Sequence, residues 1–213
     1  MEQILYIIPR GIIIGILISA PMGPIGMLVI QRTLSKGRWP AFFTGVGAAL
    51  SDLAYCLLTG FCLSIITDFI DAHQFIIQVI GSIVLACFGI YLFRKNPTRA
   101  LKAAGVANAP NYWSDLVTGF LLTFSNPLIL FFIIGLFAQF SFIQPEYAVH
   151  HYILAFAMIF AGAILWWYGI TLLVGHLGRR INMRSLKLIN RLIGLLLCAL
   201  SIGGVVMAFV DYQ

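Results

Sequence analysis

Six stretches of this 213-residue chain are apolar for long enough to cross a lipid bilayer as helices. One helical crossing takes about 20 residues, and the stretches run over 11–30, 41–66, 74–93, 115–140, 151–175 and 188–210. Each stretch is a long, predominantly apolar run, whereas the strands of a membrane β-barrel alternate over about ten residues. The sequence therefore predicts an all-α integral membrane protein with six transmembrane helices.

Charged residues are scarce, which excludes an ordinary soluble domain. They make up 9% of the chain, and hydrophobic residues make up 61%; a soluble domain is about 25% charged. No shift of composition marks a linker, so we expect a single integral membrane domain over residues 1–213. The four cysteines all fall inside apolar stretches, which favours small core residues over a disulfide framework.

The basic residues gather in alternate connections between the apolar stretches. They concentrate around 31–40, 94–114 and 176–187, which share one side of a six-helix protein. Since positively charged loops stay in the cytoplasm, both termini are predicted to be extracytoplasmic. The net charge of +6 then reflects orientation in the membrane, and we expect no nucleic-acid partner.

Two prolines interrupt the first apolar stretch. Each removes a backbone donor and clashes with the preceding turn, and a glycine between them adds conformational freedom. Backbone groups freed inside a bilayer cost several kcal/mol each unless protein or a ligand satisfies them. We therefore predict a break in the first transmembrane helix, with candidate binding residues Ser19, Pro21, Met22, Gly23 and Pro24.

The two halves of the chain share small-residue patterns in the same order. Gly15, four residues before a serine, corresponds to Gly119, four residues before a threonine, and Gly47 corresponds to Gly162. Repeats of three helices must insert in opposite senses. The sequence predicts an inverted 3+3 repeat, with halves at about 1–93 and 115–213 and a cytoplasmic loop at about 94–114.

This repeat places a second helix break in the fourth transmembrane helix. The two breaks would meet near the bilayer midplane, where the N-terminal end of a half-helix suits a carboxylate and freed carbonyls suit an ammonium group. Such a pair could hold the zwitterion of an amino acid; the alternative is that the prolines only kink the helices or act as hinges. The candidate residues of the second break are Thr123, Ser125, Asn126 and Pro127.

Asp52 is the only acid well inside a predicted transmembrane helix. An ionised carboxylate there costs about 2.5–3.5 kcal/mol, so Asp52 should face the interior and carry a proton or a partner. It is a candidate proton-coupling group, supported by Tyr55 on the same helix face and by Ser51; the alternative is a structural hydrogen-bonding role. Trp166 and Trp167 take the corresponding register in the second half, where they could line a cavity or only pack.

Several of these stretches resemble motifs of the LysE/RhtB family of amino-acid exporters. The first break resembles that family's Pro-Gly-Pro signature, and residues 31–38 resemble its basic first loop. Further resemblances occur at Gly45–Asp52, Gly89–Leu92, Phe124–Leu128, Phe131–Phe132 and Ala138–Phe140. This chain departs from the family pattern at three places: Met22 is inserted into the signature, Leu128 replaces a lysine, and Ala138 replaces a proline.

The resemblance implies a secondary exporter of amino acids or their derivatives in the bacterial inner membrane, coupled to protons and often dimeric. We expect the substrate between the two breaks, and no cofactor. A small-ion or divalent-metal exporter of the same architecture is an alternative, because Asp52, Asn126 and freed carbonyls offer oxygen ligands, although one acid is few.

Other classes of function find less support in the sequence. We expect no enzyme, since nucleophile and nucleotide motifs are absent and Asp52 has no acid or base partner within the apolar stretches. Neither break carries a cysteine for a thiol relay, and the histidines show no zinc-site spacing. A purely structural or assembly protein is the remaining alternative.

Overall fold

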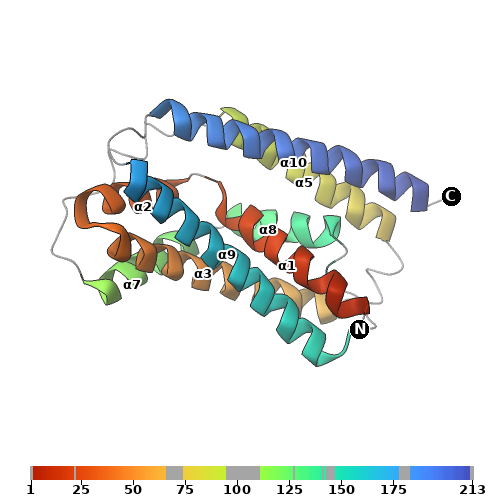
Figure 1. The fold of residues 1–213 in the computed structure, drawn as a ribbon. Coiled ribbons are helices and arrows are strands. Elements are labelled where there is room, and N and C mark those ends of the chain that lie inside the picture. The colour runs from red at the N-terminus through yellow and green to blue at the C-terminus, as the bar shows by residue number, and fades with distance from the viewer. Residues whose placement is uncertain are drawn as a thin grey trace.

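The computed structural model describes residues 2–21, 23–65, 74–94, 111–126, 128–140, 142, 147–177 and 183–211. These residues form eight helices and no strand (Figure 1). The helices are α1 (Glu2–Ser19), α2 (Pro24–Lys36), α3 (Arg38–Ile65), α5 (Gln74–Arg94), α7 (Tyr112–Phe124), α8 (Leu128–Gln139), α9 (Val149–Leu177) and α10 (Met183–Asp211). Met22, Pro127 and most of the predicted loop at 94–114 lie outside the described residues.

Four of these helices, α3, α5, α9 and α10, are each long and apolar enough to cross a membrane. Two further crossings are bent: α1 and α2 meet at 82°, and α7 and α8 meet at 74°. By length and composition, the described residues therefore hold four candidate membrane spans, or up to six if each bent pair counts as one span. Each of the six predicted stretches is covered by one long helix or one bent pair, although α1 begins before residue 11 and α2 continues beyond residue 30. The predicted breaks in the first and fourth stretches are confirmed.

Proline and glycine chemistry sets the start of α2. Pro24 occupies the first turn of this helix, where backbone N–H groups have no acceptor within the helix, so its missing N–H costs no hydrogen bond. Gly23 precedes it in an extended conformation, with φ −84° and ψ −160°. The chain therefore leaves α1 at Ser19 and restarts as a helix in a new direction five residues later.

The polar connection predicted over 31–40 is almost entirely helical. Its first residues continue α2 to Lys36, and α3 begins at Arg38. Gly37 turns the chain between them with a φ of 93°, which lies in the left-handed region that glycine adopts without strain. Two basic side chains of this segment, Arg32 and Lys36, lie within ion-pair distance of Asp115 on α7.

Three pairs of helices build the bundle: α1 with α9, α3 with α7, and α5 with α10 (Figure 1). Glycines bring the first two pairs into backbone contact. A Cβ added to Gly15 would collide with the carbonyl oxygen of Ile159 in α9, and one added to Gly119 would collide with that of Thr44 in α3. Small residues allow this close approach of helices in lipid.

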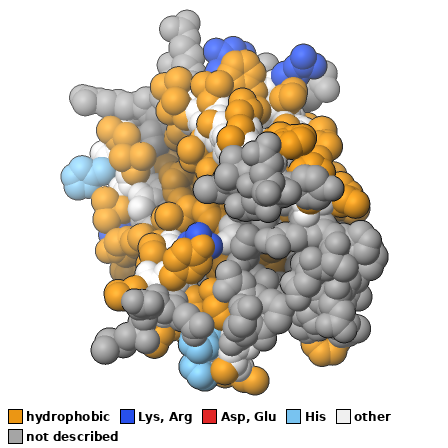
Figure 2. Space-filling model, turned by 90° about the vertical axis from the view of Figure 1, so that its right-hand side faces the viewer, with side chains coloured by type: hydrophobic (Ala, Val, Ile, Leu, Met, Phe, Trp, Pro, Cys, Tyr) orange, Lys and Arg blue, Asp and Glu red, His pale blue; other side chains and the backbone are white. Residues whose placement is uncertain are grey.

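The outer surface of the bundle is apolar. Figure 2 shows hydrophobic side chains across the described part of one face, and large side chains stand exposed on the long helices, among them Phe61, Ile153 and Ile202. Exposed apolar surface on this scale is unusual for a soluble monomer and suits contact with lipid. Together with the apolar helices, it fits a multi-pass membrane protein.

Candidate functional site

Both helix breaks line a single cavity of about 210 Å³. Roughly seven water molecules occupy this volume in liquid water. It lies between the two bent helix pairs and α3, α5 and α9. The lining residues are Ile18, Ser19, Pro21, Gly23, Pro24, Ile25, Ala48, Asp52, Phe88, Tyr91, Leu92, Leu122, Thr123, Asn126, Leu128, Ile129, Phe132 and Trp167. Eight of the predicted site residues are in this set.

Asp52 supplies the carboxyl group of the cavity. It sits on α3 and is 3% exposed, and the hydroxyl of Ser19 at the end of α1 donates a hydrogen bond to its Oδ2 at 3.1 Å. An ionised carboxylate buried away from water is costly without a partner. The geometry therefore suits a group that holds a proton or pairs with a cationic group of a ligand.

At the first break, the N-terminus of α2 opens onto the cavity. Its N-cap residue, Gly23, has no side chain that could cap the helix, and Pro24 has no backbone N–H. The first backbone donor of the helix therefore belongs to Ile25, which lines the cavity. Helix N-termini favour negative groups through these donors and through the helix dipole.

At the second break, the N-terminus of α8 is capped by the chain itself. Asn126 accepts hydrogen bonds from the amide of Leu128 on its Oδ1, at 3.3 Å, and from the amide of Ile129 on its backbone oxygen, at 3.2 Å. Thr123, at the end of α7, is 3% exposed, and its hydroxyl has no hydrogen-bond partner among the described residues. The two breaks are therefore chemically unequal.

One wall of the cavity comes from α5 and α8 and is aromatic. The rings of Phe88 and Phe132 stack with centroids 4.3 Å apart and planes 13° apart, and Tyr91 and Leu92 continue the α5 side. None of these four residues is among the predicted site residues, although three of them lie in motifs that resemble the family. The apolar residues of α5 are spread over all faces of the helix, so the sequence does not indicate which face lines a cavity.

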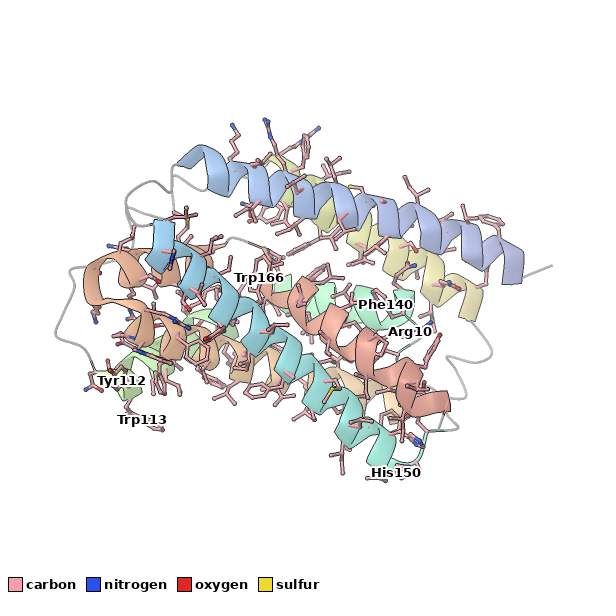
Figure 3. The ribbon with its side chains drawn as sticks, in the orientation of Figure 1. Arg10, Tyr112, Trp113, Phe140, His150 and Trp166 are labelled. Atoms are coloured by element: carbon pink, nitrogen blue, oxygen red, sulfur yellow. The ribbon has the colours of Figure 1, made fainter. Side chains whose placement is uncertain are left out.

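Several predicted site residues lie outside the lining. Ser125 is exposed and donates to the carbonyl oxygen of Leu121 within α7. Ser51 is fully buried, with no hydrogen-bond partner for its hydroxyl among the described residues. Trp166 (Figure 3) packs against the apolar core.

The side chain of Tyr55 contacts the second break. Its hydroxyl donates to the carbonyl oxygen of Phe124 at 2.6 Å, and its ring stacks on the Phe124 ring with centroids 5.0 Å apart. Phe124 is the last residue of α7. Tyr55 thus satisfies a carbonyl that the helix break leaves without a partner inside α7.

An ionic cluster holds the C-terminal end of α2 against α7. Asp115 Oδ1 lies 3.2 Å from Arg32 Nη1 and 3.3 Å from Lys36 Nζ. Arg32 also donates to Thr44 Oγ1 at 2.6 Å. The Asp115 side chain is 1% exposed and occupies the first turn of α7, where the helix dipole favours negative charge. Sequence analysis assigned these bases only a role in orientation.

A second polar contact holds the C-terminal end of α8 against α1. Arg10 Nη1 donates to the carbonyl oxygen of Phe140 at 2.6 Å (Figure 3). The Arg10 guanidinium also stacks over the Tyr6 ring, 3.2 Å from its centroid. Each bent pair is thus anchored at its far end by a polar group on the first half of the other pair.

The described residues contain no group of three or more His, Cys, Asp or Glu placed to hold a metal ion. The alternative of a metal exporter therefore gains no observation in its favour. The cysteines whose side chains the structure describes, Cys56, Cys87 and Cys198, are free, and none of them lines the cavity.

Comparisons with known proteins place these features in a family. Residues 16–207 match the family described as LysE type translocator. The chain is 28% identical over 158 residues to the "Putative amino acid efflux protein YcgF" of Bacillus subtilis (strain 168), which covers 73% of this chain and 74% of that protein. It is 24% identical over 139 residues to the "Uncharacterized membrane protein YahN" of Escherichia coli (strain K12), and this match covers 65% of this chain and 61% of that protein. No solved structure gives a significant match.

Proposed function

The chain belongs to the LysE type translocator family, and on that premise we propose that it is a secondary exporter of amino acids or their derivatives. One observation carries this function: both helix breaks and Asp52 meet at one cavity. Interrupted transmembrane helices that converge in this way are the form in which many secondary transporters build their substrate sites. The efflux protein named above supplies the substrate class by similarity.

Asp52 is the proposed coupling group. Its buried carboxylate is stable when neutralised either by a proton or by the ammonium group of the substrate. The proton and the substrate's ammonium group therefore compete for Asp52. If the protein changes between its inward-open and outward-open states only when Asp52 is neutralised, it exchanges substrate for protons. Asp52 would release its proton to the cytoplasm as the substrate binds, and would take up a proton from the outside as the substrate leaves.

The contacts between helices support the proposed inverted repeat. Gly15 and Gly162 make the close backbone contacts of α1 with α9, and Gly119 and Gly47 make those of α7 with α3. These are the four glycines whose spacing predicted the repeat. In each pair, the first half of a broken helix crosses the second transmembrane helix of the other repeat.

The basic residues support the proposed orientation in a bacterial inner membrane, with both termini extracytoplasmic. Arg32 and Lys36 end α2 on the side that is then cytoplasmic, where they bind Asp115. Arg10 and the carbonyl of Phe140 then lie at the opposite side. The two anchors of the bent pairs would thus sit at the two mouths of the transport path.

Counterflow in liposomes tests the proposed function. Purified protein is reconstituted into liposomes loaded with a mixture of unlabelled amino acids, and the entry of labelled amino acids is compared with that of manganese ions. We expect accumulation of at least one amino acid above protein-free liposomes. Accumulation of manganese without any amino acid would instead support the metal-exporter alternative.

A further inference from the structure

The described lining of the cavity carries negative charge and no positive charge. Asp52 is the one charged side chain among the described lining residues, which include no lysine, arginine or histidine. One carboxylate can pair with one ammonium group. A second cationic group on the substrate would enter without a partner, and a second anionic group would face Asp52 with no base nearby, so either would carry the cost of burying an unpaired charge.

Apolar groups dominate the remaining wall. The stacked rings of Phe88 and Phe132 stand beside Leu122 and Leu128. An apolar side chain leaves water favourably against such a wall, by about 25 cal/mol for each Å² buried. A polar side chain would lose its hydrogen bonds to water there.

Two hydrogen-bond donors in the lining are unused. The Thr123 hydroxyl and the Trp167 indole N–H have no hydrogen-bond partner among the described residues, although their side chains are 3% and 1% exposed. Buried donors without an acceptor are rare in native proteins and call for a ligand or water. Both donors are uncharged, and a carboxylate is the acceptor that would bind them most strongly.

Resting on the export function proposed above, we propose that the site selects α-amino acids whose side chain is apolar. Asp52 and Ser19 bind the substrate's ammonium group. Thr123 and Trp167 donate to its carboxylate, together with the first backbone amide of α2. The ring pair Phe88–Phe132 contacts its side chain.

An equilibrium binding assay tests this selectivity without requiring transport. Labelled L-leucine is bound to the purified protein and displaced with unlabelled L-leucine, L-lysine, L-glutamate, 3-methylbutylamine (leucine without its carboxylate) and 4-methylpentanoate (leucine without its ammonium group). We expect leucine to bind at least about tenfold more tightly than lysine or glutamate. Because Asp52 is the charged group, 4-methylpentanoate should bind more weakly than 3-methylbutylamine.

A matched variant tests the donors. Trp167→Phe keeps the aromatic ring and removes the N–H, so leucine should bind about tenfold more weakly while 3-methylbutylamine binds as before. Thr123→Val removes the other donor at similar volume and gives the same pattern if Trp167→Phe does not fold. Ile90→Ala, on the exposed side of α5 and outside the lining, should change neither affinity.

The outcomes separate this selectivity from the export function. Equal or tighter binding of lysine or glutamate would overturn the selectivity, even if the protein transports amino acids. An equal loss of leucine and 3-methylbutylamine in both donor variants would overturn the assignment of the carboxylate. Selective leucine binding without counterflow would leave the selectivity standing and remove the export function, whereas counterflow of a charged amino acid by a protein that does not bind leucine would overturn the selectivity alone.

Discussion

Replacing Asp115 with asparagine should destabilise the protein more than any other change of a single charge near the end of α2. Asp115→Asn keeps the size of the side chain and removes the negative charge that pairs with Arg32 and Lys36. The two cations would then face each other across a neutral amide. The expected result is a loosening of α2 from α7.

Burial sets the size of the loss. The side chains of Asp115, Arg32 and Lys36 are 1%, 13% and 9% exposed. Removing one partner of a buried ion pair costs about 3–5 kcal/mol, because the remaining charge stays uncompensated. Since both bases retain some contact with solvent, we expect about 3 kcal/mol. For a chain of this length that corresponds to a melting temperature lower by about 6–12 °C.

Thermal unfolding of the purified protein in detergent, followed by tryptophan fluorescence, measures this loss. Lys36→Gln is the matched control: it leaves the Arg32–Asp115 pair in place, so no buried charge loses its last partner, and it should cost clearly less than Asp115→Asn. The double variant should lose less than the sum of the two single losses, since the residues share one network. A melting temperature for Asp115→Asn within about 2 °C of the wild type would refute the role of the cluster.

Two further predictions concern the helix contacts. Gly15→Leu places a side chain against the carbonyl oxygen of Ile159 and should prevent folding, seen as loss of the monodisperse peak in size-exclusion chromatography; Gly169→Ala, whose Cβ would have no atom within 4 Å, should elute like the wild type. Tyr55→Phe removes the hydrogen bond to the carbonyl of Phe124 and should lower the free energy of unfolding by about 1–3 kcal/mol, measured by thermal unfolding in detergent; an unchanged melting temperature would contradict the capping role.

The helix breaks could be predicted from sequence because their cause is local. Pro24 and its glycine neighbour act on the backbone within one turn, so their effect does not depend on the rest of the fold. The apolar stretches gave the membrane-spanning helices for the same reason, since their length alone decides the crossing. Asp52 could be singled out because a carboxyl group within an apolar helix needs a neutralising partner wherever it lies.

The remaining features depend on contacts between distant parts of the chain. Asp115 stands 79 residues from Lys36, and no local pattern joins them. The contribution of Phe88 to the cavity follows from how α5 packs on α8, which an evenly apolar helix does not reveal. The hydrogen bond from Tyr55 to the end of α7 joins residues 69 positions apart in the chain.

Proton movement during amino-acid exchange is the most direct test of the account. Liposomes containing the protein and a trapped pH-sensitive dye are given an outward gradient of the amino acid that the counterflow assay identifies. For the wild type, we expect amino-acid efflux to acidify the lumen, because each substrate that leaves is exchanged for a proton at Asp52. Asp52→Asn should abolish this acidification, while Ile90→Ala should preserve it. Acidification of the lumen at the wild-type rate by Asp52→Asn would contradict the central claim.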